Sequence, residues 1–496
     1  MRRIFLLGLL LGLSAALRAA DAPRLAVAPW LLPPGTANAV SFTVVRGDDR
    51  RVHLLWLESA GDRRALRFAR QTSPEAGWET PVTVPTDHAI VADATEAPAL
   101  AADRHGRLTA VWQRPAAEPA GHGTGHPAAA SPYFSRSGDG GRTWSDPQPL
   151  TPSGRPAEFV TLAALADGRV LAAWLEQVTA KTVHLVSRIV GESGPDLTVD
   201  RAVCECCPPA LTAFPDGTAL LAYRGRTEEN VRDIRTARFR AAAWEESRSL
   251  NHDDWRLAAC PVNGPALASD GGRVAAAWFT AGDNDPRVLV SASPDAGGRF
   301  LLPLRLSETR PAGRPAAAIL RDGALLAAWV DGAGGLRLRR VTPEFSLSVE
   351  AGLADPAAGA VRGRPRLLVL EDYRGGREPA RLLSAWLQAG GGLRGALVTV
   401  PEGELLEAEK SCDCAPTAEQ LAGYPFFGTV VSVFPDTLEI GVRHDEVPGL
   451  LPAGRHRFLA SAAMVAAAVP GRRFIGRCDP AGEVRRLVEF RPVAAP

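Results

Sequence analysis

Cysteine has the most unusual spacing of any reactive residue in this sequence of 496 residues. The string CECC places three thiols within four positions, and a fourth thiol follows at Cys260. Cys204 lies five residues before Pro209 of a PAL string, and Cys260 lies five residues before Pro265 of the next one. Because repeated strings take equivalent positions in a repeated fold, we expect four thiols to meet at one place. They are Cys204, Cys206, Cys207 and Cys260.

These thiols fit three kinds of chemistry, which the sequence leaves open. In an exported protein cysteines commonly pair as disulfides, and Cys204 with Cys260 is the pair that would join neighbouring repeats. Thiolates are also preferred ligands of soft metal ions, of which copper(I) fits best here. A redox-active pair is the third alternative. The odd total of seven cysteines leaves at least one thiol unpaired unless a metal ion or a second chain engages it.

Arginine is the second side chain whose placement suggests binding chemistry. A guanidinium group pairs with a carboxylate through two parallel hydrogen bonds, so clustered arginines suit a small anionic ligand. The segment YRGRTEENVRDI and the repeated GRP strings supply arginines next to expected strand ends, where solvated turn residues are the alternative interpretation. The candidates for binding a glycan or another small anion are Arg224, Arg232, Asp233, Arg314 and Arg364.

The elements that position these residues recur along the chain. Each unit reads as an apolar strand, a turn rich in Asp and Gly, and a second strand that ends in an aromatic residue, as in VTLAALADGRVLAAW. Third strands such as RVLVSAS follow, and then a fourth; four strands in about 50 residues are typical of a propeller blade. We count seven units between about residues 40 and 400, and their aromatic residues are Trp56, Trp112, Trp174, Tyr223, Trp278, Trp329 and Trp386.

Two short strings lie at the expected turn between third and fourth strands. Both follow the pattern Ser-x-Asp-x-Gly-x-x-aromatic. A carboxylate in such a turn accepts backbone N–H bonds, and glycine permits a positive φ. We therefore predict a structural role for these Asp boxes rather than a catalytic one. Their residues are Ser137, Asp139, Gly141 and Trp144 in the first, and Ser293, Asp295, Gly297 and Phe300 in the second.

With these boxes, the first 400 residues resemble the sialidase superfamily, and CECCPPALTAFPDG is similar to strings in exported exo-alpha-sialidase-like propellers of bacteria. The resemblance implies three arginines that hold a sugar carboxylate, an Asp acid/base and a Tyr nucleophile activated by Glu. The family's Arg-Ile-Pro signature is missing, PRLAVAP at Arg24 being the nearest string, and Tyr373 is expected in a turn. The family has six blades and the repeats count seven, so six or seven blades stay open.

The last 75 residues break the repeat. They contain five short strand-like stretches, which predict a small barrel of the OB type. Residues 426–492 resemble the periplasmic copper-binding domain of heavy-metal efflux systems, through His444, the string DEVPG, Leu451 to Ala453 and Phe458. Gly454 and His456 stand where that family has methionine. The alternatives are a changed metal site at His444 and His456, aided by Cys478 or the CDC pair, and a barrel without metal.

The N-terminus and the overall charge limit the setting. Two arginines precede the apolar run IFLLGLLLGLSAAL, and small residues follow, which is typical of a secretory signal peptide. We expect a periplasmic or secreted protein without a transmembrane segment after cleavage. The 56 basic and 55 acidic residues give a net charge of +1, which indicates no nucleic-acid partner.

Together these patterns predict an all-β protein: a signal peptide (1–20), a sialidase-like β-propeller of six or seven four-stranded blades (24–400), a linker (401–422) and an OB-type, copper-domain-like module (423–496). The sequence favours glycan binding over exo-alpha-sialidase-type hydrolysis, because no clear nucleophile is found. The alternative function is soft-metal binding or redox chemistry at the cysteines. No cofactor is certain, and copper is the candidate.

Overall fold

The computed structural model describes residues 25–61, 63–73, 77–86, 90–91, 93–115, 130–179, 182–342, 347–371, 379–400, 424–444, 454–478 and 486–492. The predicted signal peptide, Tyr373, the CDC pair, DEVPG and Leu451 to Ala453 lie outside these residues. Among the described residues no helix has the length and apolar character needed to cross a membrane.

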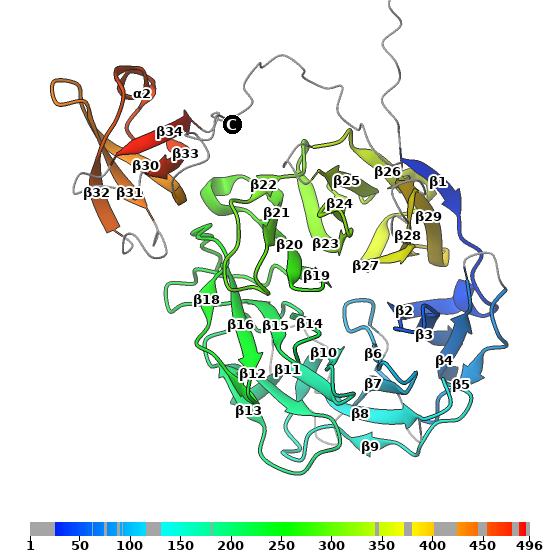
Figure 1. Cartoon of the computed structure of the whole chain (residues 1–496). Coiled ribbons are helices and arrows are strands. Elements are labelled where there is room, and N and C mark those ends of the chain that lie inside the picture. Colours follow the sequence, from blue (N-terminus) through cyan, green and yellow to red (C-terminus); the bar gives the residue numbers. More distant parts are fainter. Residues whose placement is uncertain are drawn as a thin grey trace, which may run out of the picture.

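The short strands separated by Asp-Gly turns form antiparallel sheets arranged in a ring (Figure 1). Seven such sheets are found in the described part of the propeller, so the count is seven blades. The first four blades contain β2 (Ala39–Arg46), β3 (Val52–Ala60), β4 (Arg63–Gln71) and β5 (Val82–Thr83); β6 (Ala99–Ala102), β7 (Leu108–Pro115), β8 (Ala130–Ser137) and β9 (Gln148–Pro149); β10 (Ala157–Ala164), β11 (Val170–Thr179), β12 (Thr182–Ile189) and β13 (Leu197–Asp200); and β14 (Ala210–Ala213), β15 (Ala219–Arg224), β16 (Ile234–Arg240) and β17 (Ala243–Trp244), with β18 (Arg248–Ser249) also on β16.

The remaining three blades follow the same order, except that the last takes one strand from the start of the chain. They contain β19 (Ala266–Asp270), β20 (Arg273–Thr280), β21 (Arg287–Ser293) and β22 (Leu304–Arg305); β23 (Pro311–Ile319), β24 (Leu325–Asp331), β25 (Leu336–Val341) and β26 (Ala351–Ala354); and β27 (Val361–Glu371), β28 (Ala380–Gln388), β29 (Gly392–Val400) and β1 (Ala26–Pro29). Short 3-10 turns are η1 (Thr36–Asn38), η2 (Gly282–Asn284) and η3 (Pro356–Ala358).

The N-terminal strand closes the ring. β1 pairs antiparallel with β29, with Ala26 opposite Thr399, and forms the fourth strand of the seventh blade. The last repeat therefore lacks a fourth strand of its own, and the seven units counted in the sequence form seven blades.

The aromatic residue of each repeat lies on the second strand of its blade, as predicted. All seven are buried, and each packs into an apolar cluster; Trp174, for example, lies with Val111 and Phe134 of the preceding blade. The small residues of the inner strands, mostly Ala, allow the strands to approach the central axis closely.

Both Asp boxes lie between the third and fourth strands, and their hydrogen bonds stay within the turn. Ser137 Oγ donates to Asp139 Oδ1 at 2.8 Å, and Gly141 N donates to Ser137 Oγ at 2.7 Å. Hydrogen bonds from Thr143 and Ser137 hold the pKa of the Asp139 carboxyl below its usual range. Trp144 packs edge-on against Phe68 of the preceding blade, 5.3 Å between ring centroids.

The second box repeats these contacts. Ser293 Oγ donates to Asp295 Oδ1 at 2.8 Å, and Gly297 N donates to Ser293 Oγ at 2.9 Å. Phe300 packs against the cluster that contains Leu220 of the preceding blade. The geometry of both boxes therefore agrees with the structural role predicted for them.

The C-terminal unit forms one five-stranded sheet. Its elements are β30 (Tyr424–Phe434), β31 (Glu439–His444), β32 (Gly454–Leu459), α2 (Ala462–Ala467), β33 (Arg473–Cys478) and β34 (Leu487–Pro492). The strand order is β32-β31-β30-β33-β34, and a parallel bridge joins Leu459 at the end of β32 to Arg486 just before β34. This bridge joins the two edges of the sheet at one point, and the OB-type barrel stays a prediction. The sequence did not predict α2.

Candidate functional site

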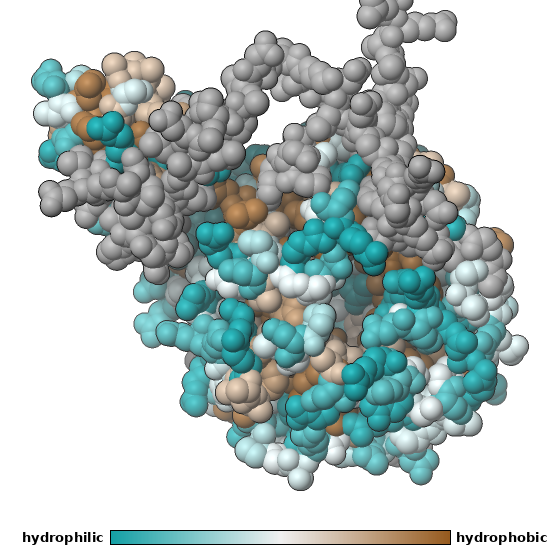
Figure 2. Space-filling model, in the orientation of Figure 1, coloured by the Kyte–Doolittle hydropathy of each residue, from teal (hydrophilic) through white to brown (hydrophobic). Residues whose placement is uncertain are grey.

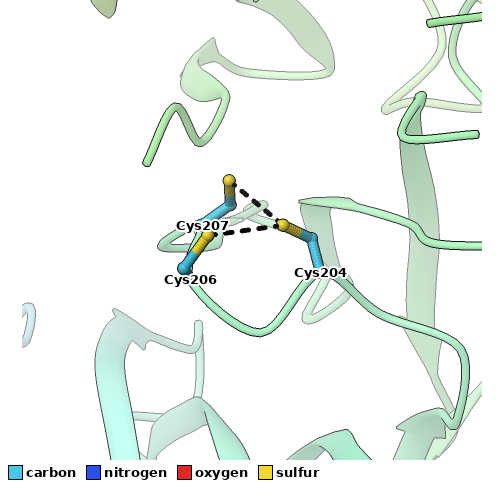
Figure 3. Close-up of side chains that lie close together, drawn as sticks. All are labelled: Cys204, Cys206 and Cys207. Atoms are coloured by element: carbon cyan, nitrogen blue, oxygen red, sulfur yellow. Dashed lines mark hydrogen bonds between the residues drawn. The ribbon is translucent and has the colours of Figure 1, made fainter. Parts of the chain in front are cut away.

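Three cysteines converge on the segment between β13 and β14 (Figure 3). The sulfur of Cys204 lies 3.8 Å from that of Cys206 and 3.4 Å from that of Cys207. All three side chains are buried. The three ligand atoms lie within 4.8 Å of one another, which is close enough to hold one metal ion.

The fourth predicted member of the cluster lies at its edge. The Cys260 thiol is exposed, interacts with the Cys206 thiol, and lies 4.0 Å from Glu205 Oε1. The expectation of four converging thiols is therefore correct for three, with Cys260 as an outer neighbour. No disulfide joins any two of the five described cysteines, so the disulfide alternative is not realised among them.

A buried arginine sets the charge of the cluster. Arg232 Nη1 donates to Cys204 Sγ at 2.9 Å and to Glu205 Oε2 at 3.3 Å. Thiol hydrogen bonds with Cys206 and Cys207, together with Arg232, hold the pKa of Cys204 far below its usual range. The bonds to Cys204 raise the pKa of Cys206, and burial raises the pKa of Cys207 to about 12. Arg232 thus favours the thiolate form of Cys204 over its thiol form.

The other two candidates near the cluster are engaged in internal hydrogen bonds. The Arg224 guanidinium donates to the main-chain carbonyls of Asn263 and Phe279, and its carbon lies 4.9 Å from the centroid of Trp255. Asp233 accepts from the backbone N–H groups of Asp254 and Trp255. Burial and the nearby Asp253 raise the pKa of Asp233 to about 6. These contacts give Arg224 and Asp233 a structural role.

The centre of the ring contains a cavity of about 340 Å³. It is lined by residues of all seven inner strands, mostly Ala, Pro, Leu and Val. Figure 2 shows the face that is hollowed near the centre of the ring, with hydrophilic side chains around it. The two charged residues among the described lining are Arg364 and Arg366 of β27.

These two arginines carry positive charge at the wall of the cavity, each on a half-buried side chain. Arg364 Nη2 donates to the carbonyl of Pro265, and its Nε is buried without a hydrogen-bond partner. Arg366 makes no hydrogen bond or ion pair with any described residue. Burial, reinforced by the other guanidinium, lowers the pKa of Arg364 to about 9, and burial lowers that of Arg366 to about 10. An anion in the cavity would therefore be attracted by two uncompensated cations.

Of these two residues the sequence reasoning named Arg364 and missed Arg366. A signal was present: the residue after proline in these repeats is Ala99, Ala210, Ala266 and Ala316, whereas the last repeat has Arg366. The remaining GRP candidate, Arg314, lies on β23 with a φ of 54°, and burial and the nearby Arg362 lower its pKa. It is not among the residues that line the cavity.

Neighbouring blades are joined around the cavity by a side chain that comes two residues before the inner-strand proline. Glu96 accepts from Phe159 N at 2.8 Å, Cys207 Sγ from Asn263 N at 3.3 Å, and Asn263 Oδ1 from Arg314 N at 2.6 Å. Each acceptor thus holds the backbone of the next blade. Cys207 belongs both to this series and to the thiol cluster. The next two residues, Pro208 and Pro209, line the cavity, so the cluster adjoins the cavity wall directly.

Glu96 gives this ring a pH dependence. Burial raises the pKa of its carboxyl to about 8, reinforced by Glu158. Above pH 4.5 the unfolded chain has released the Glu96 proton, whereas the folded protein still holds it up to about pH 8. The free energy of unfolding therefore falls as the pH rises from about 4.5 to about 8. The loss is about 1.4 kcal/mol for each unit of difference between the folded and unfolded pKa. The melting temperature of Glu96→Gln should therefore be closest to that of the parent at pH 5 and clearly higher than that of the parent at pH 8.

The check is calorimetric unfolding of both proteins at pH 5, 6.5 and 8, with Glu245→Gln, a carboxyl with 44% side-chain exposure, as the control. A difference in melting temperature between Glu96→Gln and the parent that is the same at every pH would contradict the burial argument.

In the C-terminal unit, the two predicted histidines meet. His444 Nε2 lies 2.7 Å from His456 Nδ1, across the paired strands β31 and β32. His444 is buried, and its ring packs on Phe458. Two imidazole nitrogens can serve as metal ligands, but Gly454 offers none. The pair alone supplies fewer ligands than a closed metal site needs.

The ring of seven four-stranded sheets defines the class: this chain is a β-propeller protein. No protein-family model matches it, and no curated protein matches it. Among solved structures, the lectin BP39L of Burkholderia pseudomallei has a TM-score of 0.51 at 11% identity, covering 73% of this chain and 99% of the lectin.

Two sialidase-type structures are more distant. The intramolecular trans-sialidase of Ruminococcus gnavus has a TM-score of 0.42 at 9% identity, over 75% of this chain and 96% of that one. The K499G mutant of the NanB sialidase from Streptococcus pneumoniae has a TM-score of 0.42 at 10% identity, covering 75% of this chain and 70% of the sialidase. At these identities the likenesses concern the fold.

Proposed function

We propose that this protein is a glycan-directed binding protein whose central cavity takes a small sugar that carries a carboxylate. The observation that carries the proposal is the pair Arg364 and Arg366, two half-buried arginines that line a cavity with no carboxylate among its described lining residues. Guanidinium groups favour carboxylates because they offer paired N–H donors in one plane.

The size and the walls of the cavity support a small ligand. A volume of about 340 Å³ lies at the lower end of the range for small-molecule sites. Ala, Pro and Leu side chains offer apolar surface to a sugar ring, and Thr43, Thr95 and Thr161 offer hydroxyl groups. The lectin with the similar fold is a carbohydrate-binding protein by its name, which supports a glycan as the ligand.

Binding fits this cavity better than hydrolysis. Glycoside hydrolysis uses a pair of carboxyl groups, or a nucleophile in place of one of them. The described residues that line the cavity include no Asp, Glu, Tyr or His. The proposal therefore assigns the cavity to recognition and no reaction to the described residues.

The setting is proposed to be outside the cytoplasm. The support is the charged and apolar pattern of residues 2–20, which a secretory signal peptide would have. Fractionation of expressing cells, with sequencing of the mature N-terminus, tests this; an intact Met1 on cytoplasmic protein would contradict it.

The test of the ligand is calorimetric titration with sialic acid and glucuronic acid, with glucose as the neutral control. Because a hydrogen bond to a charged group contributes about 1.5–3 kcal/mol, Arg366→Met should weaken binding of the acidic sugars about 10- to 150-fold. Arg362→Met, on the same strand but exposed, is the matched control and should bind as the parent does.

A stability measurement separates lost contacts from misfolding. Since Arg366 is half-buried and forms no ion pair with a described residue, Arg366→Met should unfold at the same temperature as the parent or higher. Equal binding of glucose and the acidic sugars, or unchanged affinity in a folded Arg366→Met, would contradict the proposed function.

A further inference from the structure

We propose that Cys204, Cys206 and Cys207 form a binding site for one copper(I) ion. The inference is separate from the ligand of the central cavity and rests on sulfur geometry, burial and charge around the segment between β13 and β14. Figure 3 shows the three side chains pointing toward one another.

The sulfur triangle has the size of a metal site. Two of its edges are 3.8 and 3.4 Å, and the third is at most 4.8 Å. The third edge is the distance between the sulfurs of Cys206 and Cys207. If it lies between about 3 Å and the 4.8 Å limit, a point at equal distance from all three sulfurs lies about 2.0–2.4 Å from each of them. This distance matches a thiolate–metal bond of about 2.3 Å. An ion of this size therefore needs little movement of the chain.

The number of ligands favours a soft monovalent ion. Zinc normally completes a tetrahedron with a fourth protein ligand or a water. Within the described residues the group of ligand atoms contains three sulfurs, and Cys260 is not part of it. The nearest carboxylate, Glu205, is occupied by ion pairs with Arg226 and Arg232 at 3.1 and 3.3 Å. Thiolates without oxygen or nitrogen ligands suit copper(I).

The surrounding positive charges stabilise bound thiolates. Three thiolates and one monovalent cation leave a charge of −2. Two buried arginines act on the cluster: Arg232, which donates to Cys204 Sγ, and Arg224, whose charge acts on Cys207. Both arginines therefore offset part of the negative charge that three thiolates and one monovalent cation leave, while Glu205 shares the charge of Arg232.

The protein also holds the sulfurs in position. Arg232 donates to Cys204 and the backbone N–H of Asn263 donates to Cys207, so two ligands are oriented by neighbours that cannot be ligands themselves. The Cys206 thiol interacts only with other thiols among the contacts described. It is therefore the ligand that can be removed with the least disturbance of the fold.

The experiment uses the reduced full chain with Cys412→Ser and Cys414→Ser, which removes the other close pair of cysteines. Copper(I) is titrated anaerobically against a coloured copper(I) chelator, and X-ray absorption identifies the ligand atoms. We expect one equivalent bound by three sulfur atoms. Cys206→Ala should lose more than about 100-fold in affinity, beyond the loss usual for a supporting residue, and Cys478→Ala should change it less than threefold.

Two results would overturn the proposal. One is equal copper(I) affinity in the parent and in Cys206→Ala. The other is preferential binding of zinc by four sulfurs, abolished by Cys260→Ser, which would make the cluster a tetrahedral zinc site. X-ray absorption of the protein with all three cysteines in place reports the number and type of ligand atoms, so this test does not depend on the folding of a cysteine variant of the cluster.

Discussion

Arg224→Met is expected to lower the free energy of unfolding by about 3–5 kcal/mol. The side chain is buried, and its guanidinium donates to the carbonyls of Asn263, Phe279 and Arg232. Methionine fills a similar volume but leaves these buried acceptors without a donor, at a cost of about 1–3 kcal/mol for each group left unsatisfied. The loss of the contact with Trp255 adds to it.

Urea unfolding followed by tryptophan fluorescence measures this loss. Arg240→Met, at the exposed end of β16 in the same blade, is the matched control and should shift the midpoint little. If Arg224 served ligand binding instead, its removal would leave stability unchanged and weaken the binding of acidic sugars; that pattern would refute the structural role.

Gly141→Ala in the first Asp box should cost about 2–5 kcal/mol. Gly141 has a φ of 90°, and an added Cβ would lie 2.0 Å from the ring of Phe68. Backbone strain of about 1–3 kcal/mol and overpacking of about 1–3 kcal/mol both contribute. Because Phe68 belongs to the preceding blade, the change would force two blades apart.

Gly138→Ala provides the comparison within the same turn. An added Cβ at Gly138 would meet no atom within 4 Å, and its φ is not among the positive values. Thermal unfolding of the two variants should differ by several degrees, with Gly138→Ala close to the parent. Equal melting temperatures would mean that the box does not hold the two blades together.

The repeat was predictable because its signals are local. Each aromatic residue from Trp56 to Trp386 is buried on the second strand of a blade, as its place in the repeat required. The hydrogen bonds of the Asp box were predictable too, because they join Ser137, Asp139 and Gly141, which lie within one turn. The number of blades was harder, since it depends on β1 pairing with a strand from the other end of the propeller.

The candidate site was predictable only in part, because the direction of a side chain depends on tertiary packing. Arg224 ends β15 and Arg364 lies on β27; the first donates to main-chain carbonyls away from the cavity, and the second lines the cavity. Cys204 and Cys260 hold equivalent positions before a proline, and one is buried while the other is exposed. Repeat alignment gave the position of these residues, and neighbouring blades decided their surroundings.

The pairing of β1 with β29 has a kinetic consequence. Among the described propeller strands, a chain made from its N-terminus presents β1 first and its partner β29 last, so β1 stays unpaired with β29 while the strands of six blades emerge. Non-local pairing of this kind is slow, and exposed edges invite association with other chains. We therefore expect closure of the ring to follow formation of the first six blades, and a chain interrupted before residue 361 would hold six sheets and an open ring.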